Sequence, residues 1–364
     1  MPNRFVIAAA GARKTTGLVR DALGLAGKRV LITTYTNENV AQIQRYFFEI
    51  NGCVPPNVTI LPWFTFLLRD GARPYQTSLK TGLAIRSINF SSDLARIRRL
   101  VAREDVERHY LDGAGNIVSE FLSDFVCRAN EKSGGLVVKR LEGIYDAIFI
   151  DEIQDMSGPD LDLIPLILES AASVVMVGDP RQSTFYTNNS AKNKKFKGKL
   201  LDWARSLEAR GLCSVETRRD CYRCNQQICD FADALYPDYE TTVSRNAEAT
   251  GHDGVFFVRA ADVERYVASY APQALRYSRV TDTLGVEAVN IGASKGSNHD
   301  RVLIFPTGKI KKYLKTANPD DAGDKSKLYV AVTRARYSVA FVIAKPGDVC
   351  ATHLGSAPSG RLWQ

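Results

Sequence analysis

The sequence predicts an α/β protein with two domains built on parallel sheets, the first of which carries a small, mostly helical insertion. The chain has 364 residues, 45% of them hydrophobic, and is therefore long enough for two sizeable cores. Short aliphatic and β-branched runs alternate with helical stretches, as in sheets that crossover helices cover on both faces. The expected strands are 5–10, 29–33, 147–150, 173–177, 288–291 and 302–305.

The domain boundaries are predicted from changes in composition. Between residues 71 and 143 the chain carries arginine-rich helical stretches and few strand runs. We therefore expect residues 1–70 and 144–200 to form the first domain, with 71–143 as its helical insertion. A polar, lysine-rich stretch near 188–200 marks the second boundary, which leaves 201–364 for the second domain.

Charge and hydropathy narrow the class of protein. The formal net charge is +8, which is compatible with a polyanionic partner but is weak evidence by itself. The apolar run at the N-terminus is too short for a signal peptide, and no stretch approaches the roughly 20 apolar residues of a membrane span. We expect a cytoplasmic protein that has no membrane partner.

Four of the seven cysteines lie in one short segment, at Cys213, Cys221, Cys224 and Cys229. One interpretation is a metal or iron–sulfur site. The other is a set of reduced, partly buried thiols on a helix. The spacing matches no standard ligand pattern, and this favours the thiols.

A phosphate-binding loop is predicted where the first strand ends. A strand, a loop of small residues and a Lys-Thr pair opening a helix form a P-loop arrangement, in which backbone N–H groups receive phosphate oxygens. Lys14 would reach the β and γ phosphates of a nucleotide, and the Thr15 hydroxyl would ligate Mg²⁺. The candidate binding residues are Ala10, Gly11, Ala12, Arg13, Lys14, Thr15 and Thr16.

This loop departs from the usual pattern at two positions. Arg13 stands where glycine usually precedes the lysine, and Ala8 stands where the first glycine often lies. A side chain at position 13 costs about 1–2 kcal/mol if the backbone there is left-handed. The alternative is a strand–helix junction with an incidental lysine.

A second nucleotide-binding element is predicted far downstream. The apolar run 147–150 ends in Asp151 and Glu152, which is a Walker B arrangement. Asp151 would hold Mg²⁺, and Glu152 would polarise the attacking water. A solvated acidic turn is the alternative, which the P-loop upstream disfavours.

Residues 151–155, D-E-I-Q-D, resemble the D-E-x-Q-D box of the UvrD/Rep-like superfamily of ATP-dependent DNA helicases. The other boxes of that family follow in order over almost the whole chain. The resemblance implies two RecA-like P-loop NTPase domains, with ATP and Mg²⁺ as cofactors and Gln154 at the nucleotide. It also implies ATP hydrolysis coupled to 3′-to-5′ movement of a monomer on single-stranded DNA, with duplex junctions as a further ligand.

Three segments resemble boxes that contact the DNA strand or the γ-phosphate. Residues 33–37, T-T-Y-T-N, resemble motif Ia, which implies strand contacts by Thr36 and Asn37. Residues 178–183, G-D-P-R-Q-S, resemble motif III, which implies that Gln182 senses the γ-phosphate. The aromatic residues that follow it would stack on bases, although Thr187 replaces the usual tryptophan. The candidate strand-contacting rings are Phe185 and Tyr186 after motif III, and Trp63 and Phe64, for which core packing is an equal alternative.

The second half of the chain resembles motifs IV, V and VI. Residues 221–223, C-Y-R, imply that Arg223 touches the γ-phosphate, with cysteine in place of asparagine. Residues 290–296, N-I-G-A-S-K-G, place Ser294 and Lys295 at the nucleic acid, while Asn298 replaces a nucleotide-holding glutamate. In residues 329–336, Y-V-A-V-T-R-A-R, Arg334 is implied to be a second arginine finger.

Two expected features of the family are missing. No adenine-recognising glutamine box stands before the P-loop, and we therefore expect ATP and GTP to be hydrolysed at similar rates. Only a short stretch separates Arg223 from Asn290, where larger helicases insert an accessory domain. This favours single-strand translocation, weak unwinding or dependence on a protein partner.

The sequence leaves three alternatives to a motor. The first is a nucleotide-gated switch or sensor subunit of a larger nucleic-acid-processing complex, which Arg13 and the missing accessory domain favour. The second is a protein that binds nucleic acid without hydrolysis, which the presence of Lys14, Glu152, Arg223 and Arg334 disfavours. The third is a small-molecule kinase, which would leave motifs V and VI unexplained.

Overall fold

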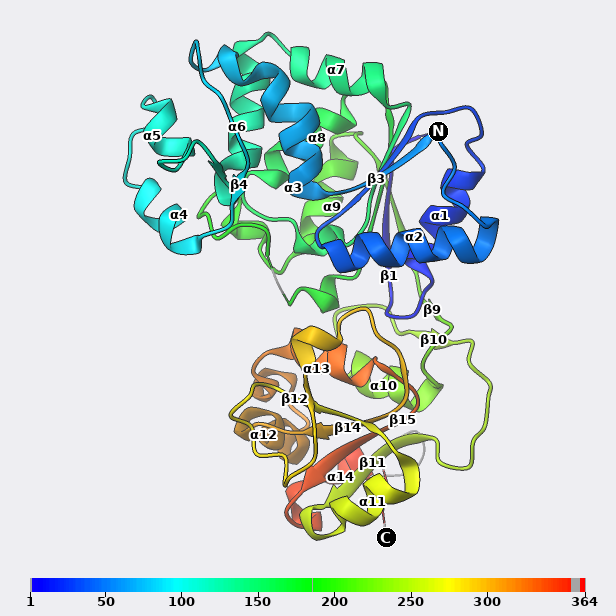
Figure 1. Cartoon of the computed structure of the whole chain (residues 1–364). Helices are drawn as coiled ribbons and strands as arrows, with labels where there is room; N and C mark the ends of the chain where they lie inside the picture. Colours follow the sequence, from blue (N-terminus) through cyan, green and yellow to red (C-terminus); the bar gives the residue numbers. More distant parts are fainter. Residues whose placement is uncertain (1, 185, 355–360, 364) are drawn as a thin grey trace. The chain divides into compact units, whose positions relative to one another are not determined.

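The computed structural model describes residues 2–184, 186–354 and 361–363, which group into two compact units (Figure 1). Each unit contains one six-stranded sheet with helices. Among the described residues no helix is both long and apolar enough to cross a membrane. Unit 1 comprises Met1–Ile7, Lys14–Pro180 and Phe185–Thr217, and unit 2 comprises Ala8–Arg13, Arg181–Thr184 and Arg218–Gln364.

The sheet of unit 1 has the strand order β3-β2-β6-β7-β1-β8. The pairs β2–β3, β2–β6, β6–β7 and β1–β7 are parallel, so the carboxyl ends of these strands meet at one edge, where α/β proteins place their ligands. The strands are β1 (Arg4–Ala8), β2 (Val30–Thr34), β3 (Val58–Pro62), β6 (Ala147–Ile150), β7 (Ser173–Gly178) and β8 (Ser214–Arg218).

Helices cover this sheet and form most of the inserted segment. The longer helices are α1 (Lys14–Leu23), α2 (Asn37–Asn51), α6 (Ser119–Lys132), α7 (Leu136–Ile144), α8 (Asp160–Leu168) and α9 (Leu200–Ala209). The shorter ones are α3 (Trp63–Phe66), α4 (Ser92–Arg98), α5 (Val106–Tyr110), η1 (Leu67–Ala72), η2 (Arg73–Ser78), η3 (Ile153–Asp155), η4 (Pro180–Gln182) and η5 (Lys194–Phe196). Two short strands, β4 (Ile88–Asn89) and β5 (Ile117–Val118), pair in parallel within the insertion.

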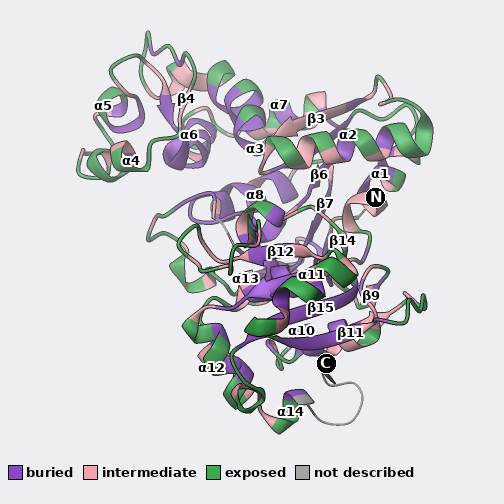
Figure 2. Ribbon diagram, turned by 60° about the horizontal axis from the view of Figure 1, so that its bottom comes forward, coloured by how far each residue is buried: buried purple, intermediate pink, exposed green. Residues whose placement is uncertain are grey.

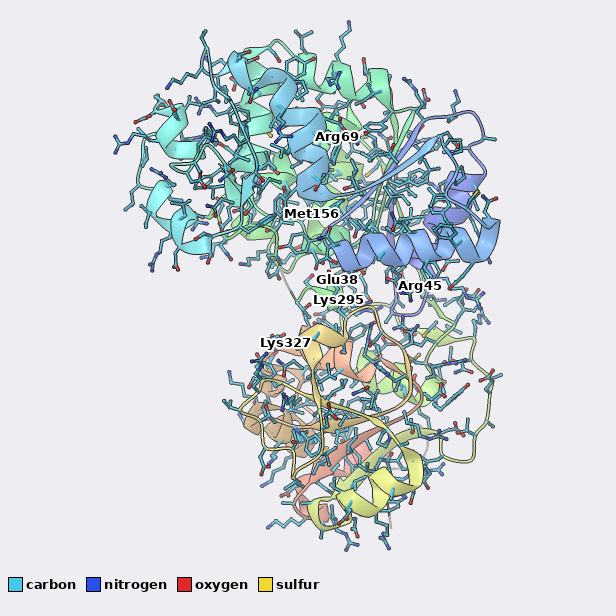
Figure 3. The ribbon with its side chains drawn as sticks, in the orientation of Figure 1. Glu38, Arg45, Arg69, Met156, Lys295 and Lys327 are labelled. Atoms are coloured by element: carbon cyan, nitrogen blue, oxygen red, sulfur yellow. The ribbon has the colours of Figure 1, made fainter. Side chains whose placement is uncertain are left out.

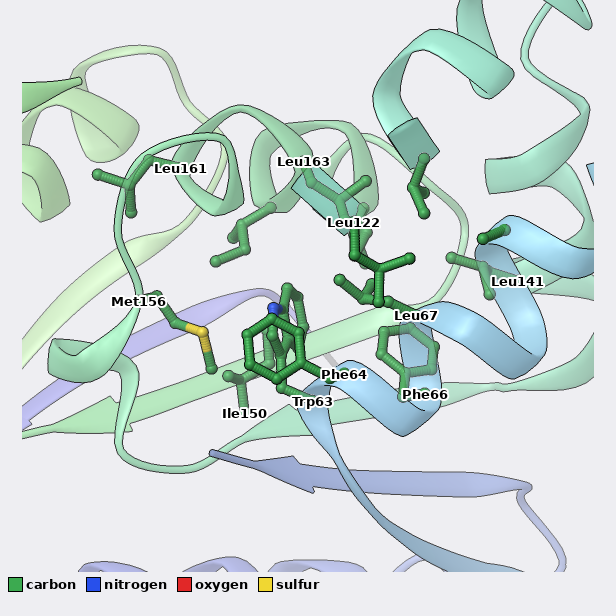
Figure 4. Packing of buried hydrophobic residues seen from close by; sticks show 14 of the residues in the cluster. Trp63, Phe64, Phe66, Leu67, Leu122, Leu141, Ile150, Met156, Leu161 and Leu163 are labelled. Atoms are coloured by element: carbon green, nitrogen blue, oxygen red, sulfur yellow. The ribbon is translucent and has the colours of Figure 1, made fainter. Parts of the chain in front are cut away.

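The inserted helices share their core with the sheet. Trp63 of α3, Leu122 of α6 and Ile150 of β6 belong to one cluster of buried residues (Figure 4). The cluster also contains Tyr110 of α5 and Phe5 of β1. Because all of these side chains are withdrawn from water together, the insertion is packed onto the sheet as part of unit 1.

The sheet of unit 2 has the order β13-β12-β14-β15-β11-β16, and every neighbouring pair is parallel. Its central strands β14, β15 and β11 are mostly buried, and their exposed residues lie at or next to the strand ends (Figure 2). The strands are β11 (Gly254–Arg259), β12 (Gln273–Arg276), β13 (Val289–Asn290), β14 (His299–Phe305), β15 (Ala335–Ile343) and β16 (Arg361–Leu362); β9 (Asp220–Cys221) and β10 (Val243–Ser244) pair separately. The helices are α10 (Gln226–Asp233), α11 (Val263–Tyr270), α12 (Gly308–Thr316), α13 (Lys325–Val332), α14 (Ala351–Leu354), η6 (Ala260–Asp262), η7 (Ile291–Ser294), η8 (Pro319–Ala322) and η9 (Pro346–Asp348).

The predicted class, α/β with parallel sheets, is confirmed, but two expectations about its limits differ from the structure. The boundary near residue 200 falls too early, because α9 and β8 belong to unit 1. Trp203 of α9 packs edge-on to Phe5 of β1, with ring centroids 5.7 Å apart. The expected strand 288–291 is only two residues long and turns directly into η7.

Candidate nucleotide and nucleic-acid sites

The P-loop lysine and threonine lie at the start of α1, beside the end of β6. The Thr15 hydroxyl donates a hydrogen bond of 2.8 Å to Asp151 Oδ2, and the Glu152 N–H donates one of 3.0 Å to Asp151 Oδ1. Thr16 follows in the first turn of the helix. Thr15 and Asp151, the two predicted metal ligands, are 136 residues apart in the sequence and meet within unit 1.

Asp151 is poised for a cation. Its side chain is buried. Burial is the main cause that raises the pKa of Asp151 to about 7, and the negative charge of Glu152 is the second. A divalent cation would stabilise the ionised form. The hydroxyl and carboxylate oxygens fit Mg²⁺, which takes one or two carboxylates together with substrate phosphates.

The turn after β6 has a strained backbone at Glu152, and Gln154 stabilises this turn through hydrogen bonds. Glu152 adopts φ +55°, a conformation that non-glycine residues avoid and that concentrates at functional sites. The Gln154 amide donates to the Glu152 carboxylate, and its Oε1 accepts from the Asp179 N–H at 3.1 Å. A Cβ at Gly178 would overlap Gln154 Oε1. Gln154 is buried and orients Glu152, so its contacts are those of a positioning residue.

The small-residue part of the P-loop, Ala8–Arg13, groups with unit 2. Within that group, Gly11 has φ +75°, and a Cβ there would lie 2.8 Å from both Cys221 Sγ and Arg223 Cβ. The Tyr222 N–H donates to the Gly11 carbonyl at 3.0 Å. Glycine is therefore required at position 11 by both conformation and close packing. Nearby, the Ala10 N–H donates to the Tyr329 hydroxyl at 3.3 Å, and Ala12 donates to the Ala9 carbonyl.

Arg13 occupies the strained position that its place in the loop predicts. Its φ is +56°, in the left-handed region, and its guanidinium lies 4.0 Å from the centroid of the Tyr222 ring. A cation–π contact at an exposed site contributes about 0.5–1 kcal/mol, which offsets part of the strain.

Substitution at position 13 separates these two contributions. Arg13→Ala loses the ring contact but keeps the strained Cβ, whereas Arg13→Gly loses both. We therefore expect the free energy of unfolding, measured by urea titration, to be larger for Arg13→Gly than for Arg13→Ala by about 1 kcal/mol or more. Equal stabilities would show that the backbone at residue 13 is not held left-handed.

Gln182, Arg223 and Arg334 lie around the C-terminal end of α13. The Arg334 guanidinium is buried and donates to the carbonyls of Val330 and Ser297, both at 3.2 Å, and to Gln182 Oε1 at 3.4 Å. Arg223 donates to the Thr333 carbonyl at 2.9 Å. Free carbonyls at a helix end attract cations, which explains why two guanidinium groups gather there.

Arg181 is a buried residue that the sequence analysis missed. Its guanidinium forms an ion pair of 2.9 Å with Asp233 and lies 4.9 Å from the centroid of the Tyr329 ring. Thr242 donates to the same aspartate from its backbone and its hydroxyl. Arg181 adjoins Gln182, but no local pattern links it to an acid 52 residues away.

The predicted strand contacts in motif Ia lie at the start of the long helix α2, and those in motif V lie at the end of the short helix η7. Thr36 caps α2 by accepting from the Asn39 N–H at 3.2 Å, and Asn37 is exposed in its first turn, beside Glu38 (Figure 3). Ser294 is buried and donates to the Ile291 carbonyl at 2.8 Å, and Lys295 follows it (Figure 3).

The interpretation of Trp63 as a strand contact is wrong. Its side chain is 0% exposed and lies among other buried hydrophobic side chains (Figure 4). Its Nε1–H donates to Asp160 Oδ1 at 2.9 Å. Phe64 is 6% exposed, so it too has little surface for a ligand. Phe185 lies outside the described residues. Tyr186 is half-buried, with Lys197 Nζ 4.5 Å from its ring centroid.

Three of the clustered cysteines are buried in the second hydrophobic core. Cys221 Sγ accepts from the Cys224 N–H at 3.3 Å, and Cys224 Sγ donates to the Thr333 carbonyl. Cys229 lies on α10 beside them. These contacts make them packing residues around the segment that carries Arg223.

Two parallel α/β sheets, a P-loop and an acidic strand end define a P-loop NTPase fold of two units. The family model for the viral superfamily 1 RNA helicase core domain matches residues 135–343, more than half of the chain. The chain therefore belongs to this family. The resemblance seen in the motif boxes is thereby confirmed at the level of superfamily 1 helicases, while the match does not extend to the UvrD/Rep-like branch.

The solved structures that are similar to the chain include three structures of viral helicases. Arterivirus nonstructural protein 10 (helicase) is 17% identical, with a TM-score of 0.49 over 95% of this chain and 61% of that one. The same protein in complex with DNA is 16% identical, with a TM-score of 0.48 over 94% and 60%. The PRRSV helicase is 16% identical, with a TM-score of 0.44 over 94% and 52%. The chain thus spans 52–61% of the length of these structures, and no curated protein matches it.

Proposed function

We propose that this chain hydrolyses ATP with Mg²⁺ and uses the reaction to move along single-stranded nucleic acid. The observation that carries the proposal is the hydrogen bond between Thr15 and Asp151, which joins the P-loop to the acidic strand end. The grouping of Gln182 with Arg334 supports it further.

In the proposed reaction, the chain's own groups bind phosphate, orient water and balance charge. Lys14 binds the β and γ phosphates, and Thr15 and Asp151 would hold Mg²⁺. When bound, Mg²⁺ would neutralise phosphate charge. Glu152, held by Gln154, accepts the proton of the attacking water.

The arginines complete the reaction chemistry. The positive charges of Arg334 and Arg223 stabilise the negative charge that develops on the transferred phosphoryl group, and Gln182 contacts the γ-phosphate. The guanidinium groups are held by backbone carbonyls at the end of α13, so their positions are set before nucleotide binds.

For the nucleic acid, we propose a single strand bound mainly through its phosphates. The UvrD/Rep-like boxes favour DNA and 3′-to-5′ movement, whereas the family to which the chain belongs is described as an RNA helicase core. The shared ligand chemistry is a phosphodiester chain with accessible bases. Residues 224–289, all described, form part of unit 2 without a separate domain, which favours translocation over strong unwinding.

The test is phosphate release by the purified chain with no nucleic acid, with oligo-dT and with oligo-U. We expect at least one strand to stimulate release, and Lys14→Ala to lower kcat by about 10²-fold or more, because a phosphate-binding charge is removed. Lys28→Ala, which removes an exposed lysine of the same unit, is the matched control and should leave kcat unchanged. Hydrolysis that neither strand alters would contradict the motor.

A nucleotide-gated switch is the second candidate, and the left-handed Arg13 favours it. A strained P-loop that binds nucleotide but turns over slowly would suit a sensor. In that case nucleotide should alter nucleic-acid affinity while phosphate release stays slow with every strand.

A further inference from the structure

Phe90 is an exposed ring on the insertion that the proposed reaction does not use. It is 67% exposed, in the turn between β4 and α4. Asn89 Oδ1 accepts from the Ser91 N–H at 2.9 Å, and Ser91 Oγ caps α4 by accepting from the Leu94 N–H at 3.2 Å. These bonds fix the turn, so the ring is held in solvent by ordered backbone.

Phe90 is the outermost of three rings in contact. Its centroid lies 5.7 Å from that of Phe64 at 70°, and the Phe64 centroid lies 5.9 Å from that of Tyr35 at 67°. Tyr35 belongs to the motif Ia segment, between Thr34 and Thr36. An edge-to-face contact leaves at least one face of a ring uncovered. The series therefore leads from a predicted strand-contacting segment to an available aromatic face.

The charge around Phe90 suits a polyanion. Residues 86–103 contain five arginines and one acid, Asp93. Arg96 is paired with Asp93, and Arg99 and Arg103 are paired with Glu120 and Asp124 of α6. Arg86 forms no ion pair with any described residue and is exposed. Arg86 precedes β4 by two residues and Phe90 follows it directly, so both belong to the same short segment of the insertion.

We propose that Phe90 stacks on a base of single-stranded nucleic acid and that Arg86 binds a neighbouring phosphate. The contact extends the path of the strand from motif Ia onto the insertion. This inference rests on the proposed function, because it needs a single strand as ligand. Positive charge and an open ring favour nucleic acid over an apolar protein partner.

The experiment measures affinity by fluorescence anisotropy, with oligo-dT, oligo-U and an abasic strand of equal length and charge. Phe90→Ala should weaken binding to the base-bearing strand by roughly 5- to 150-fold and leave abasic binding unchanged. Phe90→Leu has an apolar side chain without a ring and should weaken binding as Phe90→Ala does. Phe90→Trp has an aromatic ring and should bind with wild-type affinity. Leu100→Ala, at 89% exposed, is the matched control for apolar surface and should change nothing.

Arg86→Ala should weaken binding to the base-bearing strands and to the abasic strand by the same factor, because it removes a contact with phosphate. Wild-type affinity in Phe90→Ala, or in Phe90→Leu alone, would overturn the stacking role while leaving the proposed function standing. A wild-type chain that binds no strand at all would overturn both. Since these side chains are exposed, the substitutions should leave the free energy of unfolding within about 0.5 kcal/mol of wild type.

Discussion

Arg334→Ala is expected to lower kcat for nucleic-acid-stimulated phosphate release by about 10³–10⁵-fold. The guanidinium is held by two carbonyls and by Gln182, so it is placed without cost when the phosphoryl group develops charge. The measurement is steady-state release at saturating ATP. A decrease in kcat of less than about tenfold would show that Arg334 does not stabilise the transferred phosphoryl group.

The neighbouring Arg336 offers a control on the same segment. Its side chain is 44% exposed and pairs with Glu248 and Asp300 at the surface. Arg336→Ala should change kcat by less than twofold or so, because surface ion pairs contribute about 0–1 kcal/mol. If Arg334→Ala proves unstable, Arg334→Lys tests the same point. It keeps a charge but cannot make the forked contacts, so kcat should still fall sharply.

Asp160→Ala is expected to lower the free energy of unfolding by about 3–5 kcal/mol. The carboxylate is buried and accepts from the Trp63 indole, the hydroxyls of Ser123 and Thr187, and the Ser157 N–H. Alanine would leave these donors buried without an acceptor. Because they come from α3, α6 and the segments after the acidic turn and motif III, one carboxylate ties the insertion to the nucleotide-binding side of unit 1.

Urea titration at neutral pH checks this, with Asp162→Ala as the control on the same helix. Asp162 is partly exposed and pairs with Lys192 at 3.0 Å. Its loss should cost about 1 kcal/mol or less. Equal losses for the two variants would contradict the role of Asp160 as a buried acceptor.

The P-loop and the backbone conformation at Arg13 could be predicted from sequence because each depends on a few consecutive residues. A strand, small residues and Lys-Thr suffice for the P-loop, and the structure begins α1 at Lys14. The left-handed backbone at Arg13 likewise follows from its place in the loop. Such patterns depend on backbone geometry that neighbours alone determine.

The remaining features depend on contacts between distant residues. Trp63 looks the same in sequence whether it faces a ligand or Asp160, 97 residues away. The bond between Arg334 and Gln182 spans 152 residues. The predicted domain boundary lies too early because a polar, lysine-rich stretch resembles a linker, whereas α9 and β8 after it belong to unit 1 and β8 is a strand of its sheet.

The most direct test of the motor is displacement of streptavidin from a single strand biotinylated at one end, with ATP and excess free biotin. We expect displacement from the 5′ end and not from the 3′ end, as 3′-to-5′ movement requires, and none without ATP or with Lys14→Ala. Displacement from neither end, in a preparation that still hydrolyses ATP, would contradict translocation and leave a nucleotide switch as the function of this fold.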